Sequence, residues 1–173
     1  AMKRRSLLLT GAAAGGALIV GWSLLPPRDR MGPAALWPPT DDAVALNGWI
    51  KVANDGAVVL AMNRSEMGQG VHTALAMLVA EELDIALARV QLEQAGHDAL
   101  YGSAAGFVGV LPFVAASREP GRESALFRGA RWMTLKLARE LGINVTGGSA
   151  SVADAWGPLR WAAATARARL LGA

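Results

Sequence analysis

The chain has 173 residues, of which 53% are hydrophobic, and a formal net charge of +3. This length accommodates one ordinary domain and an appendage. The sequence has no cysteine, which excludes disulfides and any cysteine-ligated iron–sulfur cluster or zinc site on this chain. The basic residues are scattered and form no stripe interleaved with aromatic residues, so a nucleic-acid-binding surface is not expected.

Residues 1–30 begin with a basic group that is followed by an apolar run. Arg4 and Arg5 stand directly before residues 6–25, which carry no charge. This pattern predicts a twin-arginine export signal, typical of proteins that load a cofactor before export. The run is also long enough to span a bilayer with its basic end in the cytoplasm. A cleaved signal and a retained anchor both fit, and the poor cleavage context favours an anchor on the periplasmic face of the inner membrane.

Residues 31–46 belong to a proline-rich stretch, since residues 26–40 contain five prolines as well as Trp37. Such a composition favours a stiff and extended chain. We therefore expect residues 31–46 to form a tether that leads from the N-terminal helix to a domain at 47–173.

The domain opens with signals for a hairpin, a helix and a strand. Residues 48–53 and 57–63 flank an Asn-Asp-Gly turn at 54–56, which predicts two antiparallel strands. Apolar residues at helical spacing predict a helix over 71–83, and residues 90–94 read as a further strand. Residues 96–121 contain glycine and proline and are expected to be largely irregular.

The remaining residues predict two helices, over 122–141 and over about 152–171. Ser151 and Asp154 have the spacing of a capping box for the last helix. Pro158 should kink that helix or delay its start. The predicted order of elements indicates an α+β domain, with a small sheet and helices packed on one of its faces.

Two glycine-bearing loops, EMGQG at 66–70 and TGGSAS at 146–151, each stand before a predicted helix. Free backbone amides and the positive end of a helix dipole suit an anion there, although plain glycine turns would also explain both loops. The only histidines, His72 and His97, lie at no spacing typical of a metal site or a catalytic triad, so no catalytic or metal-binding residue is assigned.

Residues 65–75 and 79–83 resemble the molybdopterin-binding signature of the xanthine dehydrogenase and aldehyde oxidase superfamily. The chain is also similar to the branch typified by the isoquinoline 1-oxidoreductase beta-subunit, at residues 137–142, 146–149, 151–152, 154–156 and 158–160. The resemblance implies that the two loops contact a pterin cofactor. The cofactor-binding residues that it implies are Gly68, Gln69, Gly70, Gly147, Gly148, Ser149 and Ser151.

The resemblance also implies a molybdenum–molybdopterin cytosine dinucleotide cofactor and the oxidation of N-heterocycles or aldehydes with oxygen from water. Electrons would leave through a small subunit that carries [2Fe-2S] clusters, with a cytochrome c as a further acceptor. The family's large subunits run to several hundred residues, so the rest of the cofactor pocket and the catalytic glutamate would lie on a remaining molybdopterin-binding portion. The chain alone is therefore expected to have no turnover. The alternative is a membrane-tethered, non-catalytic binding or assembly module.

Overall fold

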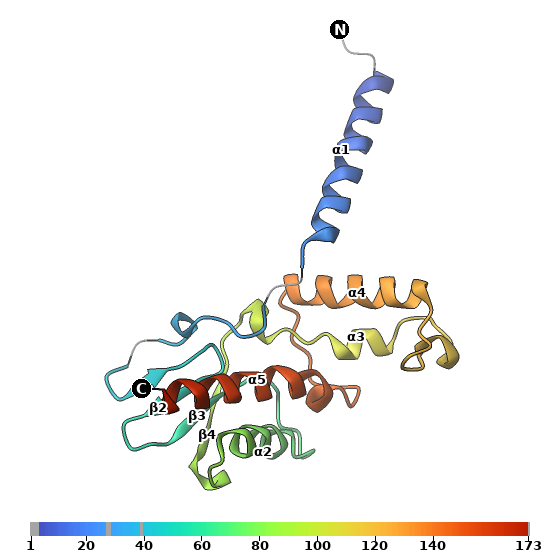
Figure 1. The fold of residues 1–173 in the computed structure, drawn as a ribbon. Helices are drawn as coiled ribbons and strands as arrows, with labels where there is room; N and C mark the ends of the chain where they lie inside the picture. The colour runs from blue at the N-terminus through green and yellow to red at the C-terminus, as the bar shows by residue number, and fades with distance from the viewer. Residues whose placement is uncertain (1–3, 27–28, 39, 173) are drawn as a thin grey trace.

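The computed structural model describes the chain over residues 4–26, 29–38 and 40–172, with side chains from residue 10 onward except at 117 and 118. It contains a four-stranded sheet in the order β1 (Ala43–Ala45), β2 (Ile50–Ala53), β3 (Val58–Met62) and β4 (Val90–Gln94). The first three strands are antiparallel, and β4 lies parallel to β3. The sheet and its helices confirm the α+β class (Figure 1).

The parallel pair of strands forms a βαβ unit. Its crossover runs through α2 (Val71–Leu83) and a short 3-10 turn at Leu87–Arg89. A parallel pair needs such a crossover because its second strand must start again from the same end. The predicted helix over 71–83 and the predicted strand over 90–94 are both confirmed.

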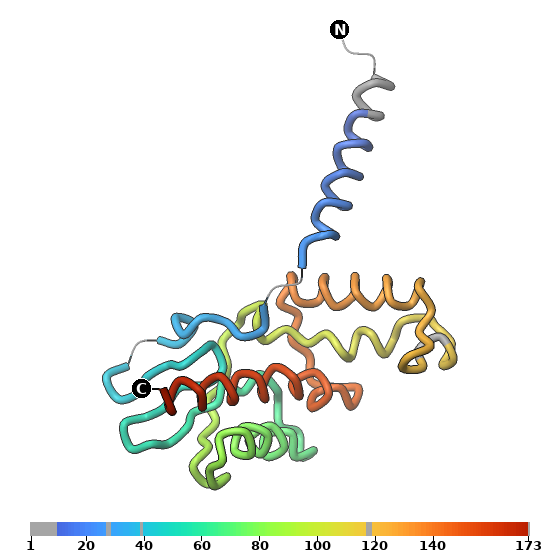
Figure 2. The backbone as a smooth tube through the Cα atoms, in the orientation of Figure 1, coloured from blue at the N-terminus to red at the C-terminus, as the bar shows by residue number. Residues whose placement is uncertain are grey.

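The long C-terminal helix α5 (Ser151–Leu171) packs along α2 and contacts β2. Leu75 and Val79 of α2 and Leu159 and Ala162 of α5 are buried together in the core with the strand residue Leu60. Figure 2 shows that α2 and α5 begin on the same side of the molecule. The loops that precede these two helices are therefore brought to one place.

Pro158 lies inside α5, so the prediction that it would delay the start of the helix is wrong. Proline lacks the N–H that would bond to the carbonyl four residues earlier, which here belongs to Asp154. Arg30 Nη1 donates a hydrogen bond of 3.0 Å to that carbonyl. The acceptor that proline leaves without a helical partner is thus satisfied by a distant side chain.

Residues 96–121, predicted to be irregular, contain the 3-10 turns Ala99–Tyr101 and Ala115–Arg118 and the short helix α3 (Ala105–Gly109). They lead into α4 (Ala125–Glu140), whose N-cap Ser124 accepts a hydrogen bond of 3.1 Å from the Phe127 amide. The predicted helix over 122–141 is therefore confirmed, with a start that is set by this cap.

The N-terminal helix α1 (Arg4–Leu24) extends away from the rest of the molecule (Figure 1). Its last turn meets α4, where the buried Lys136 ammonium donates hydrogen bonds to the Trp22 carbonyl and, at 2.6 Å, to the Leu25 carbonyl. Over the described residues, no helix is both long and apolar enough to cross a membrane. The predicted anchor helix therefore finds no support, and the side chains of the twin-arginine motif lie outside the described residues.

The predicted tether, residues 31–46, lies partly against the domain. It supplies the 3-10 turn Ala34–Leu36 and the edge strand β1. Trp37 is buried, and its Nε1–H donates a hydrogen bond of 2.8 Å to the Asn47 carbonyl. The Lys51 ammonium lies 4.6 Å from the centre of the Trp37 ring and 2.6 Å from the Glu93 carboxylate.

Tyr101 makes a buried polar contact that predicts a pH dependence of stability. Its hydroxyl donates a hydrogen bond of 2.5 Å to the Gly48 carbonyl, and burial raises the pKa of Tyr101 from 10.0 to about 12. Unfolded tyrosine ionises near pH 10, so this contribution to stability is complete below pH 10 and is lost as the pH rises towards 12.

We expect the free energy of unfolding to fall over this pH range and expect Tyr101→Phe to reduce the fall. Denaturant unfolding of both proteins at a series of pH values measures the difference. Tyr101 is the only tyrosine in the sequence, so tyrosinate absorbance reports its ionisation directly. An ionisation near pH 10 in the folded protein would contradict the expectation.

Candidate functional site

The two predicted glycine loops line one cleft of about 310 Å³. Five of the seven predicted site residues contribute to its wall, while Gly68 and Gly148 lie in the loops without lining it. The wall is formed by Met67, Gln69, Gly70, Val71, Ala74, Thr146, Gly147, Ser149, Ser151 and Val152. Residues more than 70 positions apart in the sequence therefore meet where α2 and α5 begin.

Direct hydrogen bonds join the segment that leads into the first loop to the second loop and to the residues just before it. The Ser65 amide donates to Thr146 Oγ1 at 2.9 Å. Two residues earlier in each segment, the Asn144 side-chain amide donates to the Asn63 carbonyl at 2.7 Å. These contacts fix the separation of the loops on the side where they approach each other.

A buried ion pair lies directly behind the cleft. Arg64 precedes the first loop and Asp154 lies in the first turn of α5, and their side chains are 2.6 Å apart. Arg64 also donates to the Asn144 side chain and, at 3.2 Å, to the Val145 carbonyl. Burial lowers the pKa of Arg64, and the Asp154 carboxylate opposes this effect. The two residues thus clamp the first loop to the second.

Asp154 does not cap α5, so the predicted capping box is wrong. Ala150 is the N-cap and makes no side-chain capping bond. The Asp154 carboxylate instead faces Arg30 and Arg64 and accepts hydrogen bonds of 3.1 Å from the amides of Ala104 and Ala105. A buried arginine, a partly buried arginine and two backbone amides provide more stabilisation for this carboxylate than the exposed end of a helix.

The start of α2 is already occupied by a carboxylate, that of Glu66. Its oxygens accept hydrogen bonds from the amides of Gly68, Gly70 and His72 at 2.8–3.0 Å. The His72 amide makes the largest contribution to lowering the pKa of Glu66. These three amides are therefore not free for an anion, and to that extent the expectation for the start of α2 is wrong.

The Gln69 side chain folds back on its own loop. Its amide nitrogen donates 2.9 Å to the Ser65 carbonyl, and its oxygen accepts from the Met67 amide at 2.5 Å. A primary amide has two N–H groups and two oxygen lone pairs, so each end can serve one more partner in the cleft. The loop thus holds Gln69 in place with hydrogen-bonding capacity to spare.

Backbone conformation explains the glycines at both helix starts. Gly68 and Gly70 have φ values of 91° and 78°, in the left-handed region that disfavours other residues. In the second loop, Gly148 and Ser149 follow each other with φ values of 60° and 54°. These left-handed residues turn the chain sharply, so that both loops present backbone to the cleft.

Part of this site carries no sequence motif. Arg64 and Asp154 look like ordinary surface charges in the sequence, and only the fold shows that they pair. Glu66 carried a usable signal, because an acidic residue just before a helix commonly bonds its first amides. His72, the first histidine of the chain, has its Nε2 atom 2.8 Å from the Arg64 carbonyl.

Residues 10–108 match the family model described as the molybdopterin cofactor-binding domain. The match covers more than half of the chain and includes the first loop of the cleft. The chain belongs to the molybdopterin cofactor-binding domain family. The second loop lies beyond the matched residues, and it is the geometry of the cleft that brings this loop next to the first.

Three curated relatives agree with this family. The chain is 47% identical over 66 residues to isoquinoline 1-oxidoreductase subunit beta of Brevundimonas diminuta, covering 38% of this chain and 8% of that protein. It is 29% identical over 101 residues to a membrane-bound aldehyde dehydrogenase [pyrroloquinoline-quinone] of Gluconacetobacter polyoxogenes, covering 58% and 13%. It is 40% identical over 45 residues to xanthine dehydrogenase of Blastobotrys adeninivorans, covering 26% and 3%.

These matches confirm the resemblance to the isoquinoline 1-oxidoreductase and aldehyde dehydrogenase branch of the xanthine dehydrogenase superfamily. The matched regions span between 3 and 13% of the length of the three relatives. The chain therefore corresponds to a small part of such a protein. All three relatives are named as oxidoreductases or dehydrogenases, and the match leaves most of the sequence of each uncovered.

Proposed function

We propose that the cleft between the loops 66–70 and 146–151 binds the organic part of a molybdenum–molybdopterin cofactor. The observation that carries the proposal is the meeting of the two loops. The first lies within the family match, and the second lines the same cleft with it. The seven predicted site residues would then act together, five of them from the wall and Gly68 and Gly148 by shaping the loops.

The residues present fit such a group. The cleft offers hydroxyl groups from Thr146, Ser149 and Ser151 and the amide of Gln69, which can both donate to and accept from a pterin or nucleotide edge. Within the described part of the chain, no group of three or more histidine, aspartate or glutamate side chains could hold a metal ion. What this chain offers is thus hydrogen bonds to the organic part of the cofactor.

The chain's own residues would bind and orient. The clamp of Arg64 and Asp154 would keep the two loops at a fixed separation, and Gln69 would present its remaining N–H and lone pair in a fixed direction. The starts of α2 and α5 both point at the cleft, and their dipoles favour negative charge. At the start of α2, the Glu66 carboxylate already uses this field, so an anionic group of the ligand would be favoured next to α5.

The bound cofactor would supply the oxidation of a substrate with oxygen taken from water. We propose the cytosine dinucleotide form and N-heterocycles or aldehydes as substrates, in keeping with the names of two relatives. Because the chain has no cysteine, the [2Fe-2S] clusters would lie on a small partner subunit, with a cytochrome c beyond it. The remaining molybdopterin-binding portion would supply the catalytic base, so this chain alone would have no turnover.

We also propose that the protein is exported to the periplasm by the twin-arginine route. The proposal is supported by Arg4 and Arg5 before the uncharged run at 6–25. It agrees with the proposed cofactor, since this route suits proteins that are folded and loaded before they cross the membrane.

The cleft is tested by filling it. A Cβ added at Gly147 meets no atom within 4 Å, and Gly147 is not among the left-handed residues, so Gly147→Phe should block the cleft without straining the backbone. Gly96 has the same open surroundings outside the cleft, which makes Gly96→Phe a matched control. The protein should be purified from its native host with the molybdenum-binding subunit that accompanies it.

We expect the molybdenum and pterin content of Gly147→Phe to fall to about a tenth of the wild-type value or less, as for the loss of a binding interaction of about 1.4 kcal/mol or more. Gly96→Phe should keep the wild-type content. Metal analysis and pterin fluorescence after release measure both quantities without any assay of turnover. Equal contents in the two variants would show that the cofactor lies elsewhere.

A further inference from the structure

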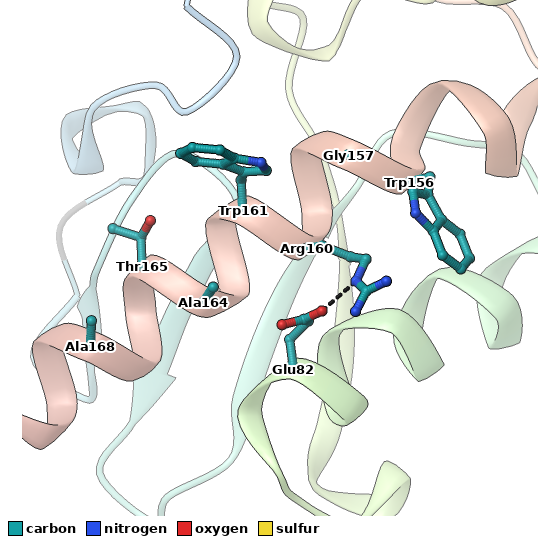
Figure 3. A pocket seen from close by; sticks show the side chains of 8 residues that line it. All are labelled: Glu82, Trp156, Gly157, Arg160, Trp161, Ala164, Thr165 and Ala168. Carbon is teal, nitrogen blue, oxygen red and sulfur yellow. Dashed lines mark hydrogen bonds and ion pairs between the residues drawn. The ribbon is translucent and has the colours of Figure 1, made fainter.

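A second hollow, a groove of about 710 Å³, runs along the outer side of α5 and reaches the end of α2. Figure 3 shows two tryptophans projecting from α5 at this groove, with Arg160 reaching across to Glu82 of α2. The groove is lined by Glu82, Trp156, Gly157, Arg160, Trp161, Ala164, Thr165 and Ala168. None of the predicted cofactor-binding residues belongs to it.

The shape of the groove suits an apolar segment of polypeptide. Trp161 is 73% exposed and Trp156 is 48% exposed, which leaves large indole surfaces in contact with water. Gly157, Ala164 and Ala168 recur at helical spacing along the same face and are too small to fill the space beside the rings. Exposed tryptophan next to a slot of small residues is typical of protein interfaces, where indole rings act as anchors.

The charge at the groove does not call for an ionic ligand. The Arg160 guanidinium bonds the Glu82 carboxylate and lies 5.2 Å from the centre of the Trp156 ring. Its charge is therefore compensated within the protein. A partner would gain mainly from covering apolar surface, at about 25 cal/mol per Å².

The position of the groove indicates which partner this is. Ser151 and Val152 line the proposed cofactor cleft, and Trp156 of the groove lies about one helical turn further along α5. Any polypeptide that completes the cleft over the start of α5 thus passes next to the groove. The two relatives with the names closest to the proposed function are long enough to supply such a polypeptide, because the matched region is only 8–13% of their length.

We propose that this groove seats an apolar segment of the remaining portion of the molybdenum-binding subunit, whether that portion lies on the same polypeptide or on a separate chain. The identity of the partner in this inference rests on the proposed function. The location of the contact rests on the groove. Trp161 is the central anchor of this interface. The contact holds the rest of the cofactor pocket against the cleft.

The test places a photo-crosslinking residue, p-benzoylphenylalanine, at position 161 of the protein expressed in its native host. The control carries the same residue at Leu126 of α4, which is 74% exposed and lies outside the groove. After irradiation of the native assembly, mass spectrometry identifies the peptides that are linked to each position. Because both positions are exposed in the structure, the substitutions should leave folding intact, which thermal unfolding verifies.

We expect position 161 to link to a peptide from the remaining portion of the molybdenum-binding subunit. The crosslinking yield should be at least about tenfold above that at position 126, as for a buried anchor compared with a surface residue outside the interface. A link to α5 of a second copy, a link to lipid, or equal yields at both positions would each overturn the inference. Cofactor content is a separate readout. A crosslink from position 161 to the remaining portion, in a protein whose cleft holds no cofactor, would refute the proposed function alone. A protein that holds cofactor but gives no such crosslink would refute the proposed role of the groove alone.

Discussion

Replacing Asp154 with alanine should destabilise the protein by about 3–5 kcal/mol, the range observed when one partner of a buried ion pair is removed. Arg64 is 1% exposed and would be left without its carboxylate. Arg30 and the amides of Ala104 and Ala105 would lose the same acceptor. The two guanidinium groups would keep their bonds to neutral oxygens but lose the only carboxylate that these contacts give them, and the two amides would lose their acceptor.

For a chain of this size, such a loss corresponds to a fall in the unfolding midpoint of about 6–20 °C. Glu119→Gln is the matched control, since it removes a carboxylate whose pair with Arg122 is exposed and whose loss should change stability by less than about 0.5 kcal/mol. Thermal and urea unfolding compare the two variants. Equal midpoints would mean that Arg64 and Asp154 do not form the clamp.

The effect on the cleft can be separated from the effect on stability. Asp154→Asn keeps the size of the side chain but removes its charge, so the protein can be studied below its lowered midpoint. We expect this variant to bind less cofactor even while folded, because Arg64 no longer holds the two loops together. An exposed carboxylate such as Glu119 has no such connection to the cleft.

The sequence pattern was sufficient to predict the helices and strands that are determined by residues close together in the sequence. The helix at Val71–Leu83 and the strand at Val90–Gln94 follow from the spacing of apolar residues, and the hairpin of β2 and β3 follows from the Asn-Asp-Gly turn. The meeting of the two glycine loops was implied by the family resemblance rather than by spacing. Only the packing of α5 along α2 shows how they come to line one cleft.

The parts that could not be predicted depend on contacts between distant residues. Pro158 is accepted within α5 because Arg30, more than 100 residues away, serves the carbonyl that proline leaves without a partner. Asp154 had the right spacing for a cap, but two arginines, Arg64 buried and Arg30 partly buried, compete for its carboxylate. The segment 31–46 reads as a tether by composition, yet Trp37 finds a buried acceptor at Asn47.

Trp49 connects the N-terminal segment to the core, and Trp49→Ala should cost about 3–5 kcal/mol of stability, as for other large-to-small changes of buried aromatic residues. Its side chain is fully buried at 0% exposure. The ring meets Tyr101 edge to face with centroids 5.0 Å apart, and Nε1–H donates a hydrogen bond of 2.6 Å to the Arg30 carbonyl. The alanine variant loses the packing and the hydrogen bond together.

Two further variants separate these contributions. Trp49→Phe keeps an aromatic ring beside Tyr101 but removes the donor to Arg30, so it should lose about 1–3 kcal/mol. Trp161→Ala is the matched control, because that indole is 73% exposed and its removal should change stability by less than about 0.5 kcal/mol. Urea unfolding followed by circular dichroism measures all three.

If the alanine variant at position 49 were no less stable than the one at 161, the N-terminal segment would not be held through this tryptophan. The position of Arg30 beside Asp154, and with it the support of the cleft, would then need another explanation.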